Sequence, residues 1–146
     1  MASKKFGIIG LGVMGENLAL NMERNGYSVA GFDLSEEARK RSAARFSGKS
    51  IEVADSLQVM VDDLEKPRRI LMMVPAGRPV DDVIQQLKPL LSKGDILIDG
   101  GNSYFKDTER RWRELAAADL LYVGTGVSGG EELSLIHISE PTRLRR

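Results

Sequence analysis

The sequence lacks several features, and each absence excludes a class of protein. It contains no cysteine, which excludes a disulfide framework and a thiolate metal site. Its longest apolar runs fall far short of the roughly 20 residues that a membrane-spanning helix needs, and no signal peptide is recognisable. Basic and acidic residues are equal in number, at 21 each, so no net charge draws the chain to other polyelectrolytes. We therefore expect a cytoplasmic protein with no nucleic-acid and no membrane partner.

Groups that carry catalysis or bind metals are also scarce. The single histidine is His137, and no cluster of histidine and carboxylate side chains suggests a metal site. No acid–base pair or nucleophile–base arrangement stands out, so we assign no catalytic residue and no metal ligand within this chain.

Length and composition fit one globular domain of 146 residues, 42% of them apolar and 29% charged. Strand-like and helix-like segments alternate with short connections, which predicts an α/β fold with a doubly wound parallel sheet. The expected strands are Phe6–Gly10, Tyr27–Phe32, Ile51–Val53, Arg69–Val74, Asp95–Asp99 and Leu120–Val123. The expected helices are Met14–Asn25, Ser35–Phe46, Ser56–Glu65, Pro79–Leu91 and Asp107–Ala118. The strand order 3-2-1-4-5-6 would place a crevice between the first and fourth strands.

The segment Gly10-Leu11-Gly12-Val13-Met14-Gly15 follows the first expected strand and opens the first expected helix. In this context the G-x-G-x-x-G pattern is typical of a Rossmann-type dinucleotide-binding domain. Gly10 allows a tight turn, Gly12 lets a pyrophosphate approach the backbone, and Gly15 lets the helix pack closely on the strand. Free N–H groups and the helix dipole then favour the phosphates. The alternative is a tight turn that binds nothing.

Asp33 ends the second expected strand, eighteen residues after Gly15. A carboxylate there accepts hydrogen bonds from a ribose 2′-OH and repels a 2′-phosphate, which favours NAD over NADP. Leu34 offers no guanidinium to a phosphate, although basic residues follow at 39–41. The alternative is a surface aspartate at the start of a helix.

Three further loops follow expected strands at their carboxyl ends, where ligands bind in open α/β sheets. Val74-Pro75-Ala76-Gly77 would line the crevice with apolar atoms. Asp99-Gly100-Gly101-Asn102-Ser103 offers the Asn102 amide to a nicotinamide or a polyol. The glycine-rich segment 124–132 offers Ser128 and backbone N–H groups to a carboxylate or hydroxyl. The alternative for each loop is a plain connection.

The last expected helix carries Trp112 among the charges of Asp107–Glu114. This mixture is typical of an amphipathic helix. We interpret Trp112 as core packing and the charges as a solvated face.

Residues Leu133–Arg146 break the pattern directly after the glycine-rich loop. They resemble the translation of a transposase sequencing adaptor, so we interpret residues 133–146 as a non-native read-through tail. The alternative is a native tail. The expected NAD(P)-binding domain then covers residues 1–132 and is truncated, with a fold that is incomplete at its C-terminal end.

Four segments together resemble 6-phosphogluconate dehydrogenase. They are Gly10–Met22, Lys66–Ile70, Gly94–Ser103 and Gly126–Glu132. The first is shared with related β-hydroxyacid dehydrogenases, whereas the other three are much more specific to the phosphogluconate enzymes. The resemblance covers nearly all of residues 4–132.

The resemblance implies an oxidoreductase of the pentose phosphate pathway, with a homodimeric parent enzyme. That enzyme would oxidatively decarboxylate 6-phosphogluconate to ribulose 5-phosphate and reduce NAD or NADP. The implied cofactor contacts are Gly10, Leu11, Gly12, Val13, Met14, Gly15, Asp33, Leu34, Ser35, Val74, Pro75, Ala76 and Asn102. The implied substrate contacts are Asn102, Ser128, Gly129 and Gly130.

Two departures from the family pattern matter. Members that use NADP usually carry Asn-Arg-Thr where this chain has Asp33-Leu34-Ser35, which again favours NAD. The family's catalytic lysine and glutamate lie downstream of this chain, so we expect the chain alone to be inactive.

Two other functions stay open. One is another β-hydroxyacid dehydrogenase, such as 3-hydroxyisobutyrate dehydrogenase, against which the motifs at 99–103 and 126–132 argue. The other is a non-catalytic NAD-binding module. Finding the lysine and glutamate in downstream sequence would favour the enzyme over the module.

Overall fold

The computed structural model describes residues 3–101 and 103–124. Within these residues one sheet contains β1 (Phe6–Ile9), β2 (Val29–Phe32), β3 (Ile51–Val53), β4 (Arg69–Met72), β5 (Ile96–Asp99) and β6 (Leu121–Gly124). The helices are α1 (Val13–Arg24), α2 (Glu36–Arg45), α3 (Leu57–Asp62), α4 (Arg78–Leu87) and α5 (Phe105–Ala116), with a short 3-10 helix, η1 (Lys88–Leu90), after α4.

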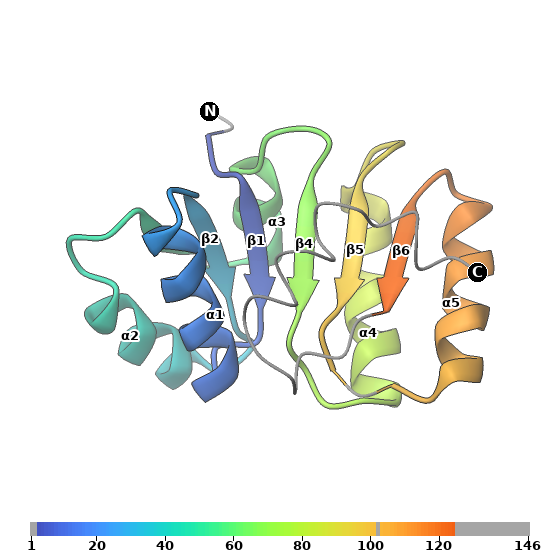
Figure 1. Ribbon diagram of the computed structural model, residues 1–146, viewed down its shortest axis with the longest axis horizontal. Helices are drawn as coiled ribbons and strands as arrows, with labels where there is room; N and C mark the ends of the chain where they lie inside the picture. Colours follow the sequence, from blue (N-terminus) through green and yellow to red (C-terminus); the bar gives the residue numbers. More distant parts are fainter. Residues whose placement is uncertain (1–2, 102, 125–146) are drawn as a thin grey trace.

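The strands lie in the order β3-β2-β1-β4-β5-β6, of which Figure 1 shows β2, β1, β4, β5 and β6 side by side. Every neighbouring pair is parallel, which confirms the doubly wound α/β fold and the predicted order. The order reverses between β1 and β4, where Gly7 pairs with Ile70 and Ile9 with Met72. Open α/β sheets bind ligands at such a reversal, at the carboxyl ends of the strands.

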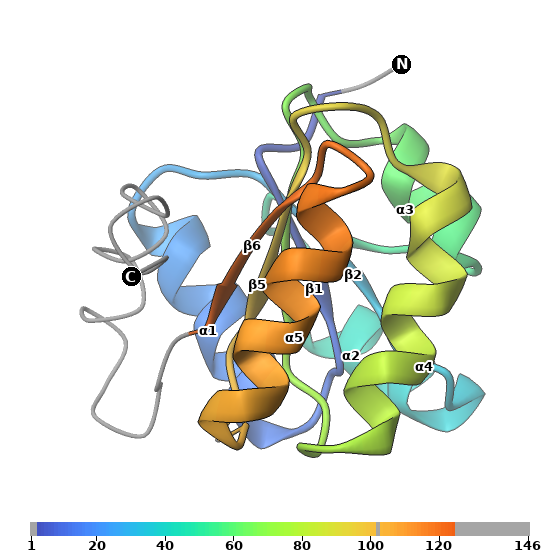
Figure 2. The same ribbon diagram turned by 90° about the vertical axis from the view of Figure 1, so that its right-hand side faces the viewer.

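Helices cover both faces of the sheet (Figure 2). α1 and α2 lie on one face, α3 and α4 lie on the other, and α5 packs beside β6. Two apolar clusters fill the layers between helices and sheet. One contains Ile8, Leu18 and Met22, and the other contains Leu87 and Leu97. Because both faces are covered, the strands read as nearly continuous apolar runs.

Local sequence chemistry accounts for two features of the helices. The Ser35 hydroxyl caps α2 and accepts a hydrogen bond from the Ala38 N–H at 3.2 Å. Residues at helical spacing on α4 form one buried stripe, made of Val80, Val83, Ile84 and Leu87.

Two helices are shorter than predicted. α3 ends at Asp62 rather than Glu65 because Leu64 forms a parallel bridge with Lys4, and the Glu65 N–H donates to the Lys4 carbonyl at 2.9 Å. α4 gives way to η1 at Lys88 because Pro89 has no N–H for the helical ladder. Backbone pairing with Lys4 thus ends α3, and the missing N–H of Pro89 ends α4.

Candidate functional site

The glycine loop leaves β1 at the carboxyl edge of the sheet, and two of its positions have no room for a side chain. Gly10 has a φ of +101°, and a Cβ there would lie 2.3 Å from the Met73 carbonyl oxygen. A Cβ on Gly15 would lie 1.9 Å from the Gly10 carbonyl oxygen. The first turn of α1 therefore packs on the loop only because these residues are glycine.

Gly12 has the opposite surroundings. A Cβ there would meet no atom within 4 Å. Gly12 is also the N-cap of α1, where no side chain caps the helix, and the next side chains, Val13 and Met14, are 76% and 47% exposed. An uncapped helix N-terminus that opens on free space offers its N–H groups to an anion. The geometry at Gly12 therefore fits a pyrophosphate.

The Asp33 carboxylate lies against the glycine loop. One oxygen accepts from the Leu11 N–H at 2.8 Å, and the other accepts from the Ser35 N–H at 2.9 Å. Each oxygen has a second acceptor position, so the carboxylate is able to accept from ribose hydroxyls as well. The Arg39 guanidinium donates to the carbonyl oxygens of Asp33 and Leu34, at 2.7 and 3.2 Å. The predicted segment 33–35 is thus tied to the loop on one side and to α2 on the other.

A cavity of about 340 Å³ connects these segments, a volume within the range of small-molecule sites. It joins the glycine loop, the exposed Leu34, the start of the 74–77 loop and one side of α4. Its lining residues are Ile9, Gly10, Gly12, Asp33, Leu34, Met73, Val74, Pro75, Pro79, Asp82, Val83 and Gln86.

A buried carboxylate ties α2 to the start of α1. Glu16 is 4% exposed, and its oxygens accept from the Ser42 hydroxyl at 2.5 Å and from Arg45 at 3.1 Å. Arg41 lies 3.5 Å from the same carboxylate and donates to the Leu11 carbonyl at 2.8 Å. Burial of a charge is tolerated when it is paired in this way. α2 therefore supports the glycine loop.

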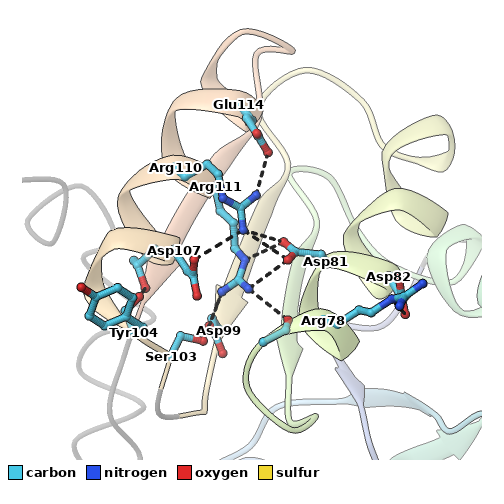
Figure 3. A network of polar contacts seen from close by, with 12 residues as sticks. Arg78, Asp81, Asp82, Asp99, Ser103, Tyr104, Asp107, Arg110, Arg111 and Glu114 are labelled. Atoms are coloured by element: carbon cyan, nitrogen blue, oxygen red, sulfur yellow. Dashed lines mark hydrogen bonds and ion pairs between the residues drawn. The ribbon is translucent and has the colours of Figure 1, made fainter.

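The carboxyl ends of β4 and β5 are joined by a second network, drawn in Figure 3. Arg111 of α5 is 1% exposed and donates to the two Asp81 oxygens at 2.8 and 3.3 Å. It also donates to the Gly77 carbonyl at 3.1 Å and to the Ser103 hydroxyl at 3.2 Å, and it lies 3.7 Å from Asp99. The Ser103 hydroxyl donates in turn to Asp99.

The charges in this network support one another. Hydrogen bonds from Arg111 lower the pKa of Asp81 against the opposing effect of burial, and Arg110 lowers it further. Burial opposes the charged form of Arg111, yet Asp81 raises the pKa of that guanidinium above its ordinary value. Burial also raises the pKa of Tyr122, whose hydroxyl donates to Asp99 at 3.1 Å. At neutral pH the network therefore holds a guanidinium cation and an Asp81 carboxylate.

The structure brings three of the predicted segments together: residues 10–15, 33–35 and 74–76 lie around one crevice. The other predicted site residues, Asn102, Ser128, Gly129 and Gly130, lie outside the described residues. The expected tail at 133–146, with His137, lies outside them too.

Two buried charged residues, Arg111 of this network and Glu16 of the cluster between α1 and α2, were not predicted as functional. The solvated face expected for Asp107–Glu114 is wrong for Arg111, which is buried. Its position four residues before Leu115, on the same helix face, was the available signal. Glu16 has the same spacing to Leu20 on α1, so this signal was available for it too. Trp112 is partly buried and packs against the core, as predicted.

Among residues 3–101 and 103–124, no group of three or more histidine, aspartate or glutamate side chains is arranged to hold a metal ion. None of the helices in these residues combines the length and the apolar character that crossing a bilayer requires.

Comparison with known proteins gives the family. The family described as the NAD binding domain of 6-phosphogluconate dehydrogenase matches residues 5–135. The chain belongs to this family. The 6-phosphogluconate dehydrogenase of Synechococcus elongatus is 57% identical over 136 residues, which is 92% of this chain and 29% of that protein. The NAD(+)-dependent enzyme of Bacillus subtilis is 50% identical over 125 residues, 86% of this chain and 27% of that protein.

One solved structure is similar in sequence and fold, and a second shares the fold. The Plasmodium falciparum 6-phosphogluconate dehydrogenase, described with NADP+ and with its substrate, has a TM-score of 0.81 at 33% identity, covering 88% of this chain and 28% of that one. A 3-hydroxyisobutyrate dehydrogenase of Mycobacterium tuberculosis has a TM-score of 0.74 at 23% identity, covering 90% of this chain and 43% of that one, and shares the fold. The chain thus spans less than a third of the length of its curated relatives.

Proposed function

We propose that this chain is the coenzyme domain of a 6-phosphogluconate dehydrogenase and that it binds NAD along the crevice between β1 and β4. The observation that carries the proposal is the uncapped N-terminus of α1 at Gly12, which opens on the 340 Å³ cavity. The match to the NAD-binding family supports the class of ligand.

In this proposal the cofactor lies across the switch point of the sheet. The N–H groups at the start of α1, in the segment Gly10–Gly15, hold the pyrophosphate. Asp33 accepts hydrogen bonds from the adenosine ribose, with Leu34 and Ser35 beside it. The adenine lies in the cavity against α4. The nicotinamide half then extends along Val74–Ala76 toward the end of β5 and Asn102.

The surroundings of Asp33 support NAD rather than NADP. Its carboxylate would lie close to a ribose 2′-phosphate, and like charges repel. The neighbouring Leu34 is 71% exposed and supplies no donor. Arg39, the nearest basic residue in sequence, already donates to two backbone carbonyls. Relatives of both kinds exist, since the Bacillus subtilis enzyme is named NAD(+)-dependent and the Plasmodium falciparum structure is described with NADP+.

The parent reaction is the oxidative decarboxylation of 6-phosphogluconate to ribulose 5-phosphate. The bound cofactor supplies a hydride acceptor for substrate C3. Asn102, Ser128, Gly129 and Gly130 are proposed to bind the substrate, and a lysine and a glutamate of the parent enzyme to act as general base and acid. We further propose a cytoplasmic, homodimeric parent enzyme, of whose coenzyme domain residues 1–132 are a truncated part, followed by a non-native tail at residues 133–146.

The test uses the full-length gene product and this chain in parallel. We expect the full-length enzyme to form ribulose 5-phosphate faster with NAD than with NADP. We expect this chain to bind NAD about tenfold more tightly than NADP, because tenfold corresponds to about 1.4 kcal/mol, the order of magnitude of one uncompensated contact between like charges. The double change Asp33→Asn with Leu34→Arg should reverse the preference.

Each of three results would overturn one part of the proposal. Tighter NADP binding by the unchanged chain would overturn the NAD assignment. Turnover of 3-hydroxyisobutyrate in place of 6-phosphogluconate would overturn the substrate. Formation of ribulose 5-phosphate by this chain alone would overturn the assignment of the catalytic groups to residues downstream of the coenzyme domain.

A further inference from the structure

Arg111 is an unusual core residue. It is among the largest side chains that are fully buried, and it occupies the face of α5 where Leu115 packs one turn later. An apolar side chain would serve packing there without the cost of removing a charge from water. We therefore expect Arg111 to have a role that an apolar residue could not fill.

The partners of Arg111 come from separate parts of the chain. Asp81 lies on α4, the Gly77 carbonyl lies at the end of the loop after β4, and the Ser103 hydroxyl lies in the loop after β5. Figure 3 shows the guanidinium lying between α5 and α4, with Asp81 and Ser103 beside it. One planar cation therefore joins two loops that leave adjacent strands.

Asp99 fixes the second of these loops. One carboxylate oxygen accepts from the Gly101 N–H at 3.0 Å. The other accepts from Ser103 and from the Tyr122 hydroxyl, and Arg111 lies 3.7 Å from it. Asp99 thus holds the Gly101 N–H, and Asp99 and Arg111 both contact the Ser103 hydroxyl, so the residues on both sides of position 102 are tied to this network.

We propose that Arg111 is a positioning residue for the nicotinamide half of the cofactor. It sets the spacing between the 74–77 loop and the 99–103 loop, and it acts through Gly77 and Ser103 rather than by touching the ligand. The inference rests on the proposed function, because it needs a dinucleotide in the crevice. The adenosine half depends on different groups, namely the glycine loop and Asp33.

This difference gives the test. NADH and ADP-ribose share the adenosine half, and only NADH carries the nicotinamide. The variant Arg111→Lys keeps the positive charge but loses the planar set of guanidinium N–H donors. We expect calorimetry on the 146-residue chain to give this variant a dissociation constant for NADH about tenfold higher than that of the unchanged chain. The constant for ADP-ribose should stay within about twofold.

Arg110→Lys is the matched control. Arg110 also pairs with Asp81, at 3.2 Å, but it is 40% exposed and its other partners are Asp107 and Glu114 rather than the two loops. We expect both dissociation constants to stay within about twofold of the unchanged chain. Thermal unfolding of each variant separates lost binding from lost structure.

A second variant keeps the test valid if the Arg111→Lys chain does not fold. Ser103→Ala removes the hydroxyl between Arg111 and Asp99 without burying an unpaired charge, and we expect it to weaken NADH binding about threefold. Its control is Ser92→Ala, which removes a hydroxyl that accepts from Arg68 at the opposite edge of the sheet. That change should leave both constants unaltered.

Each other outcome overturns the inference. Equal weakening of NADH and ADP-ribose in folded variants would mean that Arg111 supports the whole crevice. Unchanged NADH binding would mean that the two loops do not depend on it. Equal affinity of the unchanged chain for both ligands would mean that the nicotinamide half is not held. If the unchanged chain binds neither ligand, the proposed function itself fails and the inference fails with it.

Discussion

At the scale of single residues, Gly12 and Gly15 belong to one motif but have opposite surroundings. A methyl group on Gly15 would collide with the Gly10 carbonyl at 1.9 Å, so Gly15→Ala should lower the free energy of unfolding by about 3 kcal/mol. A methyl group on Gly12 would enter the space proposed for the pyrophosphate. Gly12→Ala should therefore cost at most about 1 kcal/mol as a poorer N-cap, but raise the dissociation constant for NAD about tenfold.

Urea unfolding and calorimetry of both glycine variants check this prediction, and each variant serves as the control for the other. Gly12 has φ −79° and ψ −165°, a conformation that alanine adopts without strain. A Gly12→Ala chain that unfolds easily, or a Gly15→Ala chain as stable as the unchanged one, would show that the two roles are assigned wrongly.

Side chains were predictable where a backbone rule governs them. The glycine pattern and the strand-end Asp33 follow from the turn and the strand that they border. Arg110 and Arg111 illustrate the limit, because they are adjacent and chemically identical, and only the packing of α5 on α4 buries the second. Helical spacing places only Arg111 on the face of Leu115, whereas the pairing of both arginines with Asp81 on another helix has no local signature.

At the scale of elements, the contact between α1 and α2 depends on one carboxylate. Glu16→Ala would leave the buried Ser42 hydroxyl without its acceptor and would remove the ion-pair partner that Arg41 and Arg45 share. We expect the free energy of unfolding to fall by about 2 kcal/mol. The glycine loop should also become less ordered, because Arg41 holds the Leu11 carbonyl from the same cluster.

Chemical denaturation of Glu16→Ala beside Glu36→Ala gives a matched comparison. Glu36 lies on α2 and forms an exposed pair with Lys40 at 3.9 Å, with side chains 71% and 77% exposed. Its removal should change stability by no more than about 0.5 kcal/mol. Similar losses in the two variants would refute a special role for the buried carboxylate.

The order and type of the elements were predictable because period and burial agree along most of the chain. The ends of the helices were less predictable. α3 stops where Leu64 and Glu65 pair with Lys4, a residue sixty positions earlier, and that pairing has no local signature. The end of α4 was predictable in principle, because Pro89 lacks the N–H for the next helical hydrogen bond, yet the expected helix ran on to Leu91.

At the scale of the whole molecule, ion pairs tie the sheet at both edges. At the amino ends of β4 and β5, Arg68 pairs with Asp95 at 3.0 Å and donates to the Val61 carbonyl. At the carboxyl ends, Arg111 pairs with Asp81. The first pair joins α3 to the strands far from the crevice, and the second borders the proposed cofactor site. Ion pairs thus hold elements together at both ends of the strands, and at the carboxyl ends the pair also borders the crevice where we propose that the cofactor binds.

The pairing of Asp81 makes the stability of the whole domain depend on pH. Hydrogen bonds from Arg111 hold the pKa of Asp81 below its ordinary value of 3.8, so the folded state binds this proton less readily than the unfolded state. The contribution is therefore fully present above the unfolded pKa and is lost as the pH falls through the folded pKa.

Asp81→Asn tests this dependence on pH. The unchanged chain should exceed the variant in free energy of unfolding by an amount on the order of 2 kcal/mol, constant between about pH 5 and pH 8. The difference should shrink as the pH falls below about 4, because protonation then removes the charge from the unchanged chain as well. Urea unfolding at a series of pH values measures it. A difference that stays constant down to about pH 2, or that widens in acid, would mean that Asp81 stabilises the domain by its shape and not by its charge.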